Sequence, residues 1–427
     1  MNYQDLLIKS PIVKGKGIYL YTKDKKKYFD STGGITGTVT LGWDNKQIQN
    51  SIKKQLDNIA HIDFKSLKDV NRDKLRKILL SRNNHKLDEI YYAGNSGSEA
   101  NEGAMKLSYQ YHQANGKKNK KWFISRYQSF HGSSSETVSI GDKANLKFFK
   151  NFFPKYRTKV KEHNIYRHKR SSESYIDYTN RSIKEIELKI KQIGPDNISG
   201  FIAETMMGGL VGDVPPCENY WKKIRSLCDK YNIHLICDEI WCGAGTSGKL
   251  YCVDYEKITP DFITFGKTLT GGYVPLSLVV TKSSYLKKIK KKYGLIRLPS
   301  STYQGHSLGV VAATECMKII NNKKFLSSVI KKGEYFRSTI NSELKNNDFF
   351  LNVRGRGLRN SVEHTTTNND LFSEKLQKYA LNKFNLILGS KWHRTCFSGA
   401  INISNKDLDR LIEQYLASFK FIRNNWR

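Results

Sequence analysis

The sequence lacks any long hydrophobic run. None of its apolar stretches approaches the roughly 18 consecutive residues that a membrane-spanning helix requires, so we expect no membrane partner. The first residues, Met1 to Asp5, also lack a basic segment that leads into an apolar one. We therefore expect no secretory leader and a cytoplasmic location.

Cysteine is scarce and unpatterned. The 427 residues include seven cysteines, an odd number, and no Cys-x-x-Cys pair of the kind that binds metal. Cys237 lies in an apolar run next to Asp238, which indicates a buried and unreactive thiol. We expect reduced cysteines, no disulfide framework and no metal site.

Acidic residues are few beside the basic ones. Asp and Glu number 39 against 72 Lys and Arg, a formal net charge of +33. Such an excess is typical of proteins that bind nucleic acid. Here the cations stand in short lysine clusters at 23–27, 117–121 and 287–292, and no aromatic-interleaved basic motif accompanies them. We interpret the clusters as solvated surface and expect no specific nucleic-acid partner.

Apolar residues are plentiful enough for a large core. Hydrophobic residues make up 38% of the chain and proline numbers only 8, so disorder is excluded. The middle of the chain alternates short apolar runs with helical patterns, which favours an α/β layer structure. Strands are predicted at 201–203, 233–237, 262–265 and 278–280, and helices at 182–193, 217–230, 310–320 and 326–344.

The segment 155–181 is polar and rich in tyrosine, and it is predicted to form a long active-site or surface loop. Ser182 and Glu185 have capping-box spacing and are predicted to begin the next helix. The pattern changes again near Gly309. We expect an N-terminal segment over residues 1–50 that contributes to the small domain, a large domain over 51–308 and a smaller C-terminal domain over 309–427.

Two motifs come before the middle of the chain. Ser96 and Glu99 have the spacing of a capping box, which starts a helix whose free N–H groups suit a phosphate; the other interpretation is an ordinary capped helix. Phe130 precedes His131 and Gly132, and is either a ring that stacks on a flat heterocycle or a core residue.

Two further motifs follow buried strands. Asp238 stands at the carboxyl end of a predicted strand, where α/β proteins build their sites, and a buried carboxylate there needs a cationic partner. A protonated pyridine nitrogen, an arginine or a helix cap would each serve. Lys267 follows the next predicted strand and precedes Gly271-Gly272. An amine that forms an imine explains this placement better than a lysine that extends to solvent.

In this order the motifs resemble the class III, ω-amino-acid-type aminotransferases over nearly the whole chain. The matching stretches are Tyr28-Phe29-Asp30, 96–102, Phe130-His131-Gly132, Glu204, Asp238-Glu239-Ile240, Gly266-Lys267, 271–276, Ser301-Thr302-Tyr303 and 353–358.

The resemblance implies a fold and an assembly. The fold is the pyridoxal-phosphate-dependent transferase fold type I, an α/β structure with a large, mostly parallel seven-stranded sheet domain and a smaller C-terminal α/β domain. The assembly is a homodimer with the active site at the interface. The cofactor is pyridoxal 5'-phosphate.

The resemblance also implies roles for single residues. Lys267 would hold the cofactor as a Schiff base and then move a proton between substrate and cofactor. Asp238 would pair with the pyridine nitrogen and keep it protonated. Phe130 would stack on one face of the ring, and Ile240 would pack against the other.

Four more residues complete the implied cofactor site. Gly97 and Ser98 would bind the phosphate, helped by Thr302 of the partner subunit. Glu204 matches a glutamate that lies near the cofactor and the substrate-binding arginine.

The chain departs from the family pattern at several positions. Trp241 stands where many members have a glutamine near the cofactor hydroxyl, so the substrate pocket should differ. Thr246 replaces an arginine in the usual Gly-x-Gly-Arg-Thr-Gly, and Thr205 replaces the proline after Glu204. Arg394 is either the arginine that binds a substrate carboxylate or an ordinary surface residue.

We therefore predict a pyridoxal-phosphate-dependent aminotransferase that moves an amino group from an amine or ω-amino acid to a 2-oxo acid or aldehyde. A decarboxylase, racemase, aminomutase or phospho-lyase would use the same Lys267 and Asp238 and differ in which bond of the substrate carbon is broken. A non-catalytic basic binding protein is the alternative from another class. Intact Lys267, Asp238 and Phe130 disfavour it.

Overall fold

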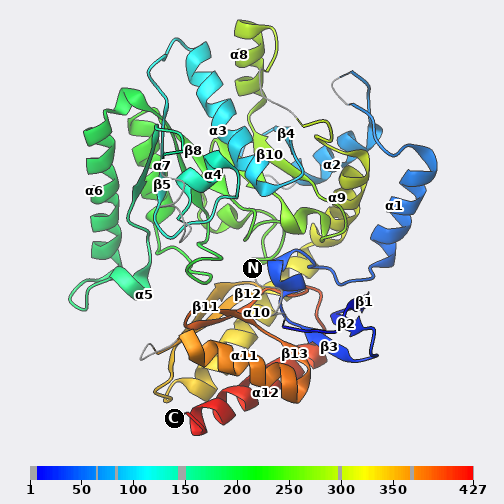
Figure 1. Ribbon diagram of the computed structural model, residues 1–427. Coiled ribbons are helices and arrows are strands. Elements are labelled where there is room, and N and C mark those ends of the chain that lie inside the picture. Colours follow the sequence, from blue (N-terminus) through cyan, green and yellow to red (C-terminus); the bar gives the residue numbers. More distant parts are fainter. Residues whose placement is uncertain are drawn as a thin grey trace.

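A seven-stranded sheet is the centre of the larger part of the molecule (Figure 1). The computed structural model describes residues 7–63, 66–81, 85–142, 151–296, 301–365 and 370–426. In the sheet, β10 runs antiparallel to both of its neighbours and the remaining pairs are parallel, which confirms the mostly parallel seven-stranded sheet. The strand order is β4 (Glu89–Gly94), β10 (Ser277–Thr281), β9 (Phe262–Phe265), β8 (His234–Asp238), β7 (Ile198–Glu204), β5 (Trp122–Arg126) and β6 (Arg157–Val160).

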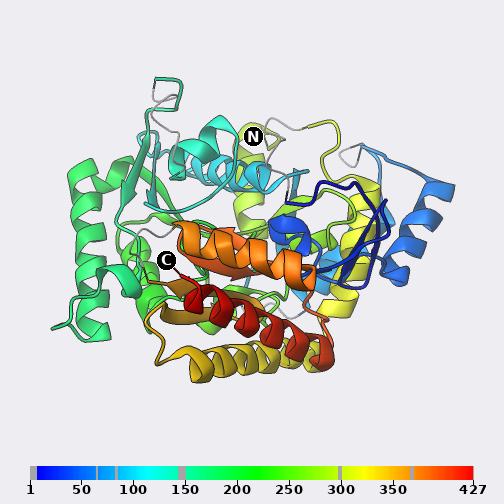
Figure 2. The same ribbon diagram turned by 60° about the horizontal axis from the view of Figure 1, so that its bottom comes forward.

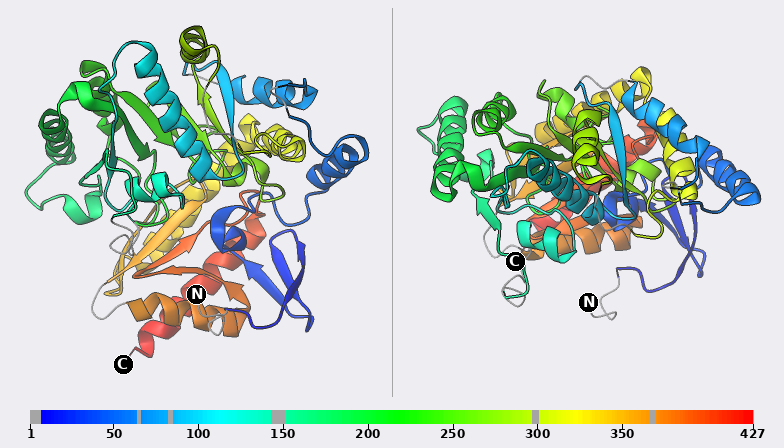
Figure 3. Two further views of the ribbon diagram at one scale, coloured as in Figure 1. Left: turned by 45° about the horizontal axis from the view of Figure 1, so that its top comes forward. Right: turned by 90° about the horizontal axis from the view of Figure 1, so that it is seen from above.

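Helices cover both faces of this sheet, so its central strands are apolar on both sides. Ile202 and Ile236 pack with α3 (Gly97–Ala114) and with α8 (Ser283–Tyr293), which lies against α3 (Figure 3). Phe201 and Leu235 point the other way, into the core shared with α7 (Tyr220–Lys230) and α9 (Ser307–Ile320). Every residue of β7, β8, β9 and β10 is buried, which explains why these strands are continuous apolar runs in the sequence.

A smaller domain lies below the large sheet in Figure 1. Its antiparallel sheet has the order β11 (Phe350–Arg356), β12 (Arg359–His364), β15 (Arg394–Phe397) and β14 (Gly389–Lys391). Three helices pack beside one another on it (Figure 2): α10 (Lys323–Leu344), α11 (Asp370–Phe384) and α12 (Asn405–Asn424).

The N-terminal segment joins this smaller domain. Its strands β1 (Ile12–Lys16), β2 (Tyr19–Thr22) and β3 (Lys27–Asp30) form a sheet with β13 (Leu386–Ile387), and Ile18 and Phe29 enter the small core. The domain boundary at residue 308 stays a prediction, and α9 packs in the core of the large sheet.

The remaining helices are α1 (Lys46–Asn58), α2 (Val70–Leu80), α4 (Ser135–Ile140), α5 (Ile165–His168) and α6 (Tyr175–Ile193).

Two expectations about local structure were wrong. The predicted loop 155–181 contains β6, α5 and the first residues of α6, which begins at Tyr175 because Ser174 and Asp177, rather than Ser182 and Glu185, form the capping box. Lys120, expected in solvent, is 1% exposed. Its Nζ donates to the carbonyl oxygens of Pro195 (3.1 Å), Ile198 (2.9 Å) and Tyr231 (3.4 Å), which replace water. Burial lowers the pKa of this amine to about 8.

The expectations for two lysine clusters and for Cys237 hold. The lysines of 23–27 and 287–292 are exposed, and Cys237 is buried with its pKa raised by burial. Within the described ranges no helix has the length and apolarity to cross a bilayer, and no cluster of His, Cys, Asp and Glu suited to a metal ion is found.

Candidate active site

The carboxyl ends of three adjacent strands converge at one edge of the large sheet. Glu204 ends β7 and pairs in register with Asp238, which ends β8; Asp238 pairs in turn with Thr264 of β9. Lys267 is the second residue after the end of β9. The sheet therefore brings two carboxylates and one amine together, as expected where parallel strands end.

Asp238 is a buried carboxylate that the protein holds by three contacts. Its Oδ2 lies 2.8 Å from Nδ1 of His131 and accepts a hydrogen bond of 2.8 Å from Asn101 Nδ2. Its Oδ1 accepts from the backbone N–H of Ile240 at 3.0 Å. The side chain is 3% exposed, so these contacts fix its orientation.

Lys267 is half-buried and follows Gly266 with a φ of 42°, in the left-handed region. A non-glycine residue there is strained, and such strain is typical of functional positions. Its Nζ lies 6.0 Å from the ring centre of Phe130 and 5.1 Å from that of Trp241. Within the described part of the chain, no hydrogen bond or ion pair holds this amine. Burial lowers its pKa; nearby Asp238 opposes that effect and Arg359 adds to it.

A cradle suited to a phosphate lies at the N-terminus of α3. The predicted capping box is confirmed: Ser96 and Glu99 cap each other's backbone, and Gly97 and Ser98 are the first residues of the helix. N–H groups at this position lack an intrahelical acceptor. A Cβ on Gly132, whose φ is 144°, would lie 2.5 Å from Ser98 Oγ, so only glycine lets this loop approach α3.

Phe130 and Ile240 border the space beside Lys267. Phe130 is half-buried. Ile240 packs closely on Gly97, because a Cβ added to Gly97 would lie 2.6 Å from Ile240 Cδ1. The Asp238 carboxylate, the α3 N-terminus and a ring on one side are what pyridoxal phosphate needs for its nitrogen, its phosphate and its flat heterocycle. The residues present therefore fit the cofactor.

Glu204 is almost fully buried, and its carboxylate accepts few hydrogen bonds. Its Oε1 accepts a long hydrogen bond of 3.4 Å from the N–H of Gly208, and its Oε2 has no partner among the described atoms. Burial raises its pKa to about 7, and the nearby Asp238 adds to this while His131 and Arg126 oppose it. Nε2 of His131 is a second buried atom without a partner there.

Trp241 lies against Lys267 and is held from several sides. Its Nε1 donates to Asp213 Oδ1 at 2.7 Å, and Asp213 Oδ2 accepts from Ser361 Oγ at 2.7 Å. The guanidinium carbon of Arg359 lies 4.2 Å from the centre of the indole. Trp241 thus belongs to the site, at the position where the sequence departs from the family pattern.

Arg394 is a buried residue, at 3% exposure, and the surface-arginine alternative is therefore wrong. Its Nη2 donates to the carbonyl oxygen of Leu210 at 2.6 Å, whereas its Nε has no partner among the described residues. Its stem packs on Gly212, next to Asp213. Its role toward a substrate carboxylate stays a prediction.

Thr302 is exposed on this chain, where its carbonyl oxygen lies 3.2 Å from Nε2 of His61. No hydrogen bond joins it to Gly97 or Ser98 in the described part of the same chain. The role of Thr302 at the phosphate site of a partner subunit stays a prediction.

The sequence did not identify several residues of the site. Asn101 and His131 hold Asp238 from elements more than a hundred residues away, and Asp213 and Arg359 hold Trp241. The sequence could have pointed to His131, because this residue lies inside the Phe-His-Gly motif. It points only weakly to Asn101, which follows the capping box on the helical face that meets the sheet. No local pattern in the sequence points to Asp213 or Arg359.

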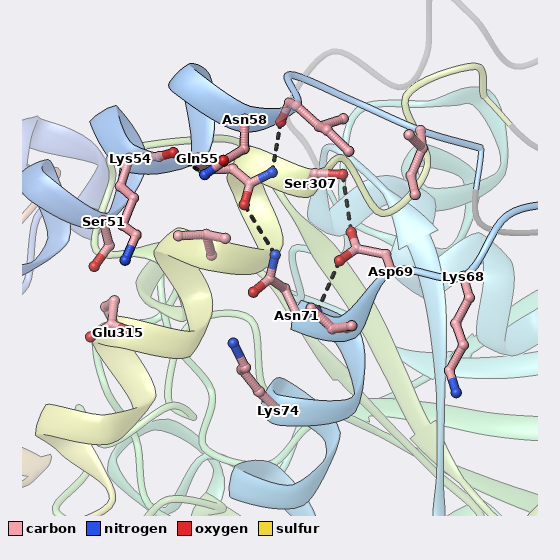
Figure 4. A pocket seen from close by; sticks show the side chains of 14 residues that line it. Ser51, Lys54, Gln55, Asn58, Lys68, Asp69, Asn71, Lys74, Ser307 and Glu315 are labelled. Atoms are coloured by element: carbon pink, nitrogen blue, oxygen red, sulfur yellow. Dashed lines mark hydrogen bonds between the residues drawn. The ribbon is translucent and has the colours of Figure 1, made fainter.

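A separate pocket of about 530 Å³ lies between α1, α2 and α9. Figure 4 shows its polar side chains engaged with one another: Asn71 donates to Gln55, and Ser307 donates to Asp69. None of the residues around Lys267 lines it.

Comparison with known sequences places these features in a family. The class-III aminotransferase family matches residues 2–412. The adenosylmethionine-8-amino-7-oxononanoate aminotransferase of Staphylococcus aureus is 30% identical over 420 residues, which cover 94% of this chain and 90% of that protein. Gamma aminobutyrate transaminase 2 of Solanum lycopersicum is 30% identical over 356 residues, with coverage of 82% and 77%.

Comparison with solved structures supports the same fold. The omega transaminase of Pseudomonas jessenii in complex with PMP has a TM-score of 0.91 at 24% identity, and the match covers 98% of this chain and 93% of that one. The PMP-bound aminotransferase of Vibrio fluvialis has a TM-score of 0.88 at 22% identity, with coverage of 97% and 93%.

Proposed function

The chain belongs to the class III aminotransferase family, and we propose that its amino donor is an amine or an ω-amino acid and its acceptor a 2-oxo acid or an aldehyde. As a family member it is a pyridoxal-phosphate-dependent enzyme that transfers amino groups. The proposal concerns the substrates, the roles of single residues and the assembly.

The names of relatives support this donor class. One acts on γ-aminobutyrate, and the diaminobutyrate–2-oxoglutarate transaminase of Halomonas elongata is 29% identical over 361 residues. Both substrates carry an amino group on a terminal CH₂, away from the carboxylate. The similar folds include omega transaminases.

Each residue at the sheet edge has a proposed task. Bound pyridoxal phosphate supplies an aldehyde that captures nitrogen and a ring that accepts electrons from the substrate carbon. Lys267 would hold the cofactor and then move a proton from the amino-bearing carbon of the donor to the cofactor, and in the reverse direction for the acceptor. Asp238 pairs with the pyridine nitrogen, while Asn101 and His131 keep its carboxylate in place.

The remaining residues bind and orient. The N–H groups of Gly97 and Ser98 bind the phosphate, and Phe130 and Ile240 hold the ring between them. Glu204 lies beside Asp238 near the ring. Arg394 is the group that could bind a substrate carboxylate, once it leaves the carbonyl oxygen of Leu210.

One observation carries the proposal. The Lys267 amine lies near two aromatic rings, no carboxylate pairs with it in the described chain, and burial lowers its pKa. A neutral amine is the form that reacts with an aldehyde. A lysine with only a structural role would be paired or would extend to solvent.

We propose that the active enzyme is a homodimer, in which Thr302 of the partner subunit completes the phosphate site. Its exposed position supports this. Exposed apolar side chains that are close in sequence to Thr302, or to His61 which it contacts, support it as well: Leu56, Ile59, Leu67, Val70, Leu295 and Tyr303. The cytoplasm stays our expectation for its location, and unpaired cysteines agree with a reducing compartment.

A donor panel tests the proposed function. The purified protein, loaded with pyridoxal phosphate, is offered γ-aminobutyrate, alkylamines and α-amino acids with pyruvate, 2-oxoglutarate or an aldehyde as acceptor. We expect amino transfer from donors with a terminal CH₂–NH₂ group. Release of CO₂, racemisation without an acceptor, or transfer from α-amino acids alone would contradict the proposal.

A further inference from the structure

We infer that Arg359 is a positioning residue for Lys267: the buried charge of its guanidinium keeps the amine of Lys267 in the neutral form. The two residues come from different domains, because Arg359 begins β12 of the smaller domain and Lys267 follows β9 of the large sheet (Figure 1). The inference rests on the proposed function, in which Lys267 holds the cofactor, and it gives Arg359 a part in that function beyond packing.

Arg359 and Lys267 approach the same side chain. The guanidinium carbon of Arg359 lies 4.2 Å from the ring centre of Trp241, and Nζ of Lys267 lies 5.1 Å from it. Nη2 of Arg359 also lies 3.3 Å from Oγ1 of Thr268, the residue after Lys267. These contacts place the two cationic groups within about 10 Å of each other, a range at which buried charges still interact.

The guanidinium of Arg359 is buried and bound to neutral oxygens. The residue is 1% exposed, and it donates to the carbonyl oxygens of Trp241 (3.1 Å), Ser398 (2.8 Å) and Gly37 (2.6 Å). No salt bridge to a carboxylate holds it among the described residues. Burial lowers its pKa to about 10, and the attraction of Asp213 opposes this effect, so Arg359 is charged at neutral pH. Its charge therefore acts on its neighbours without a paired anion to cancel it.

The other groups that act on Lys267 have the opposite effect or no charge. Burial lowers the pKa of Lys267 most, the carboxylates of Asp238 and Glu204 oppose this, and Arg359 adds to it. Cys242 carries no charge at neutral pH, because burial raises the pKa of its thiol. Arg359 is thus the cation among these groups, on β12, whereas the two carboxylates end β8 and β7.

A neutral amine is what both proposed tasks of Lys267 require. Its nitrogen lone pair forms the bond to the aldehyde carbon of pyridoxal phosphate, and the aldehyde oxygen leaves as water with the two amine hydrogens. The same lone pair later accepts the proton of the donor carbon. An ammonium ion has no lone pair for either step. Repulsion between two unit charges about 10 Å apart changes the ratio of neutral to charged amine on the order of 10-fold.

Competitive labelling of the full-length apoprotein reads the charge of this amine directly. The protein is labelled with a trace of acetic anhydride between pH 6 and pH 10, and peptide mass spectrometry gives the pH profile of each lysine. In the wild type we expect Lys267 to become reactive at a lower pH than the exposed lysines of α8. In Arg359→Gln we expect labelling of Lys267 at pH 8 to fall on the order of 10-fold and to recover at higher pH. Arg359→Lys keeps the charge and should stay near the wild type.

The capture of cofactor is a second measurement on the same apoproteins. Stopped-flow absorbance should show that Arg359→Gln captures pyridoxal phosphate on the order of 10-fold more slowly at pH 8, and that higher pH restores the rate. Arg337→Gln is the matched control, because Arg337 is a half-buried arginine that donates to the Gly357 carbonyl oxygen and to Asn360 Oδ1. This variant also removes a guanidinium beside β12, and it should leave both pH profiles as they are.

Circular dichroism and thermal unfolding show whether each variant folds. If Arg359→Gln folds and Lys267 titrates as in the wild type, or if Arg337→Gln shifts the profile equally, the inference is wrong. If Arg359→Gln does not fold, Arg359→Met takes its place under the same criterion. A wild type in which Lys267 titrates like the lysines of α8 contradicts the inference without any variant. An enzyme that shows the expected titration but transfers no amino group contradicts the proposed function alone.

Discussion

Nδ1 of His131 lies 2.8 Å from Oδ2 of Asp238, and both side chains are almost fully buried. Asn101 donates to the same oxygen, and the Ile240 N–H donates to the other one. A carboxylate with three such contacts keeps one orientation. These contacts fix the carboxylate of Asp238 in the position proposed for the counter-charge of a cationic ring.

The first prediction concerns this counter-charge. Asp238→Asn keeps the size of the side chain but removes the charge that keeps a pyridine nitrogen protonated. We expect an intact fold and a loss of kcat on the order of 100-fold or more, the typical effect of removing an electrostatic contact to the transition state. Steady-state kinetics and circular dichroism check this. Near-normal turnover would assign the role to another residue.

Lys267 gives the second prediction. Reduction of the holoenzyme with borohydride should attach the cofactor covalently, and peptide mapping should find it on Lys267. Lys267→Ala should fold, bind the cofactor without a covalent bond and lose amino transfer. Label on one of the many exposed lysines instead would show that the assignment is wrong.

The sequence predicted the parts of the site that local patterns encode. Asp238 ends one continuous apolar strand and Lys267 follows another, and Ser96 with Glu99 starts a helix. A short local sequence pattern therefore marks the position of each of these residues. Ser174 and Asp177 have the same capping spacing as Ser182 and Glu185, and only the packing of α6 decides between them. The contacts of Asp213 and Arg359 with Trp241 join segments 28 and 118 residues apart, and no local pattern encodes such contacts.

Glu204 gives a prediction about pH. Burial raises the pKa of this carboxyl from 4.5 to about 7. Between these values the unfolded chain releases the proton and the folded chain keeps it, so the free energy of unfolding falls as pH rises through this window. The slope is about 1.4 kcal/mol per pH unit.

The variant Glu204→Gln removes this dependence. In the apoprotein we expect it to raise the unfolding free energy relative to wild type at pH 8 and to change it little at pH 4, where both states of the wild type are protonated. Chemical denaturation at the two pH values measures the difference. An equal effect at both would mean that Glu204 titrates normally in the folded protein.

Buried histidines predict the opposite trend in acid. Burial lowers the pKa of His112, His163 and His364 to about 3 and that of His234 to about 4. Below pH 6.5 these histidines bind protons in the unfolded chain but not in the folded chain. The free energy of unfolding therefore falls as pH falls from 6.5 toward 4. Each histidine contributes a slope of about 1.4 kcal/mol per pH unit.

Denaturation at pH 7 and pH 5 tests this trend. The wild type should lose several kcal/mol over this interval, since four histidines act together, and His364→Gln should lose less. His364 is a suitable position because Nε2 lies 3.0 Å from Thr395 Oγ1, a contact that a glutamine amide can replace. A variant with the same acid sensitivity as wild type would contradict the assignment.

The last prediction concerns the net charge of +33. Five exposed lysines of α8, between 287 and 292, form one dense cluster without a described acidic partner. A surface of this kind binds polyanions through the release of counterions, so binding should lack sequence preference and weaken steeply as salt rises. Replacing the five lysines with glutamine should lower the slope of log K against log salt and leave amino transfer as it is, because none of these exposed lysines is among the residues assigned to the site. A salt-resistant complex with a defined RNA or DNA, or amino transfer that depends on one, would contradict our interpretation of the charge as solvated surface and favour a binding function.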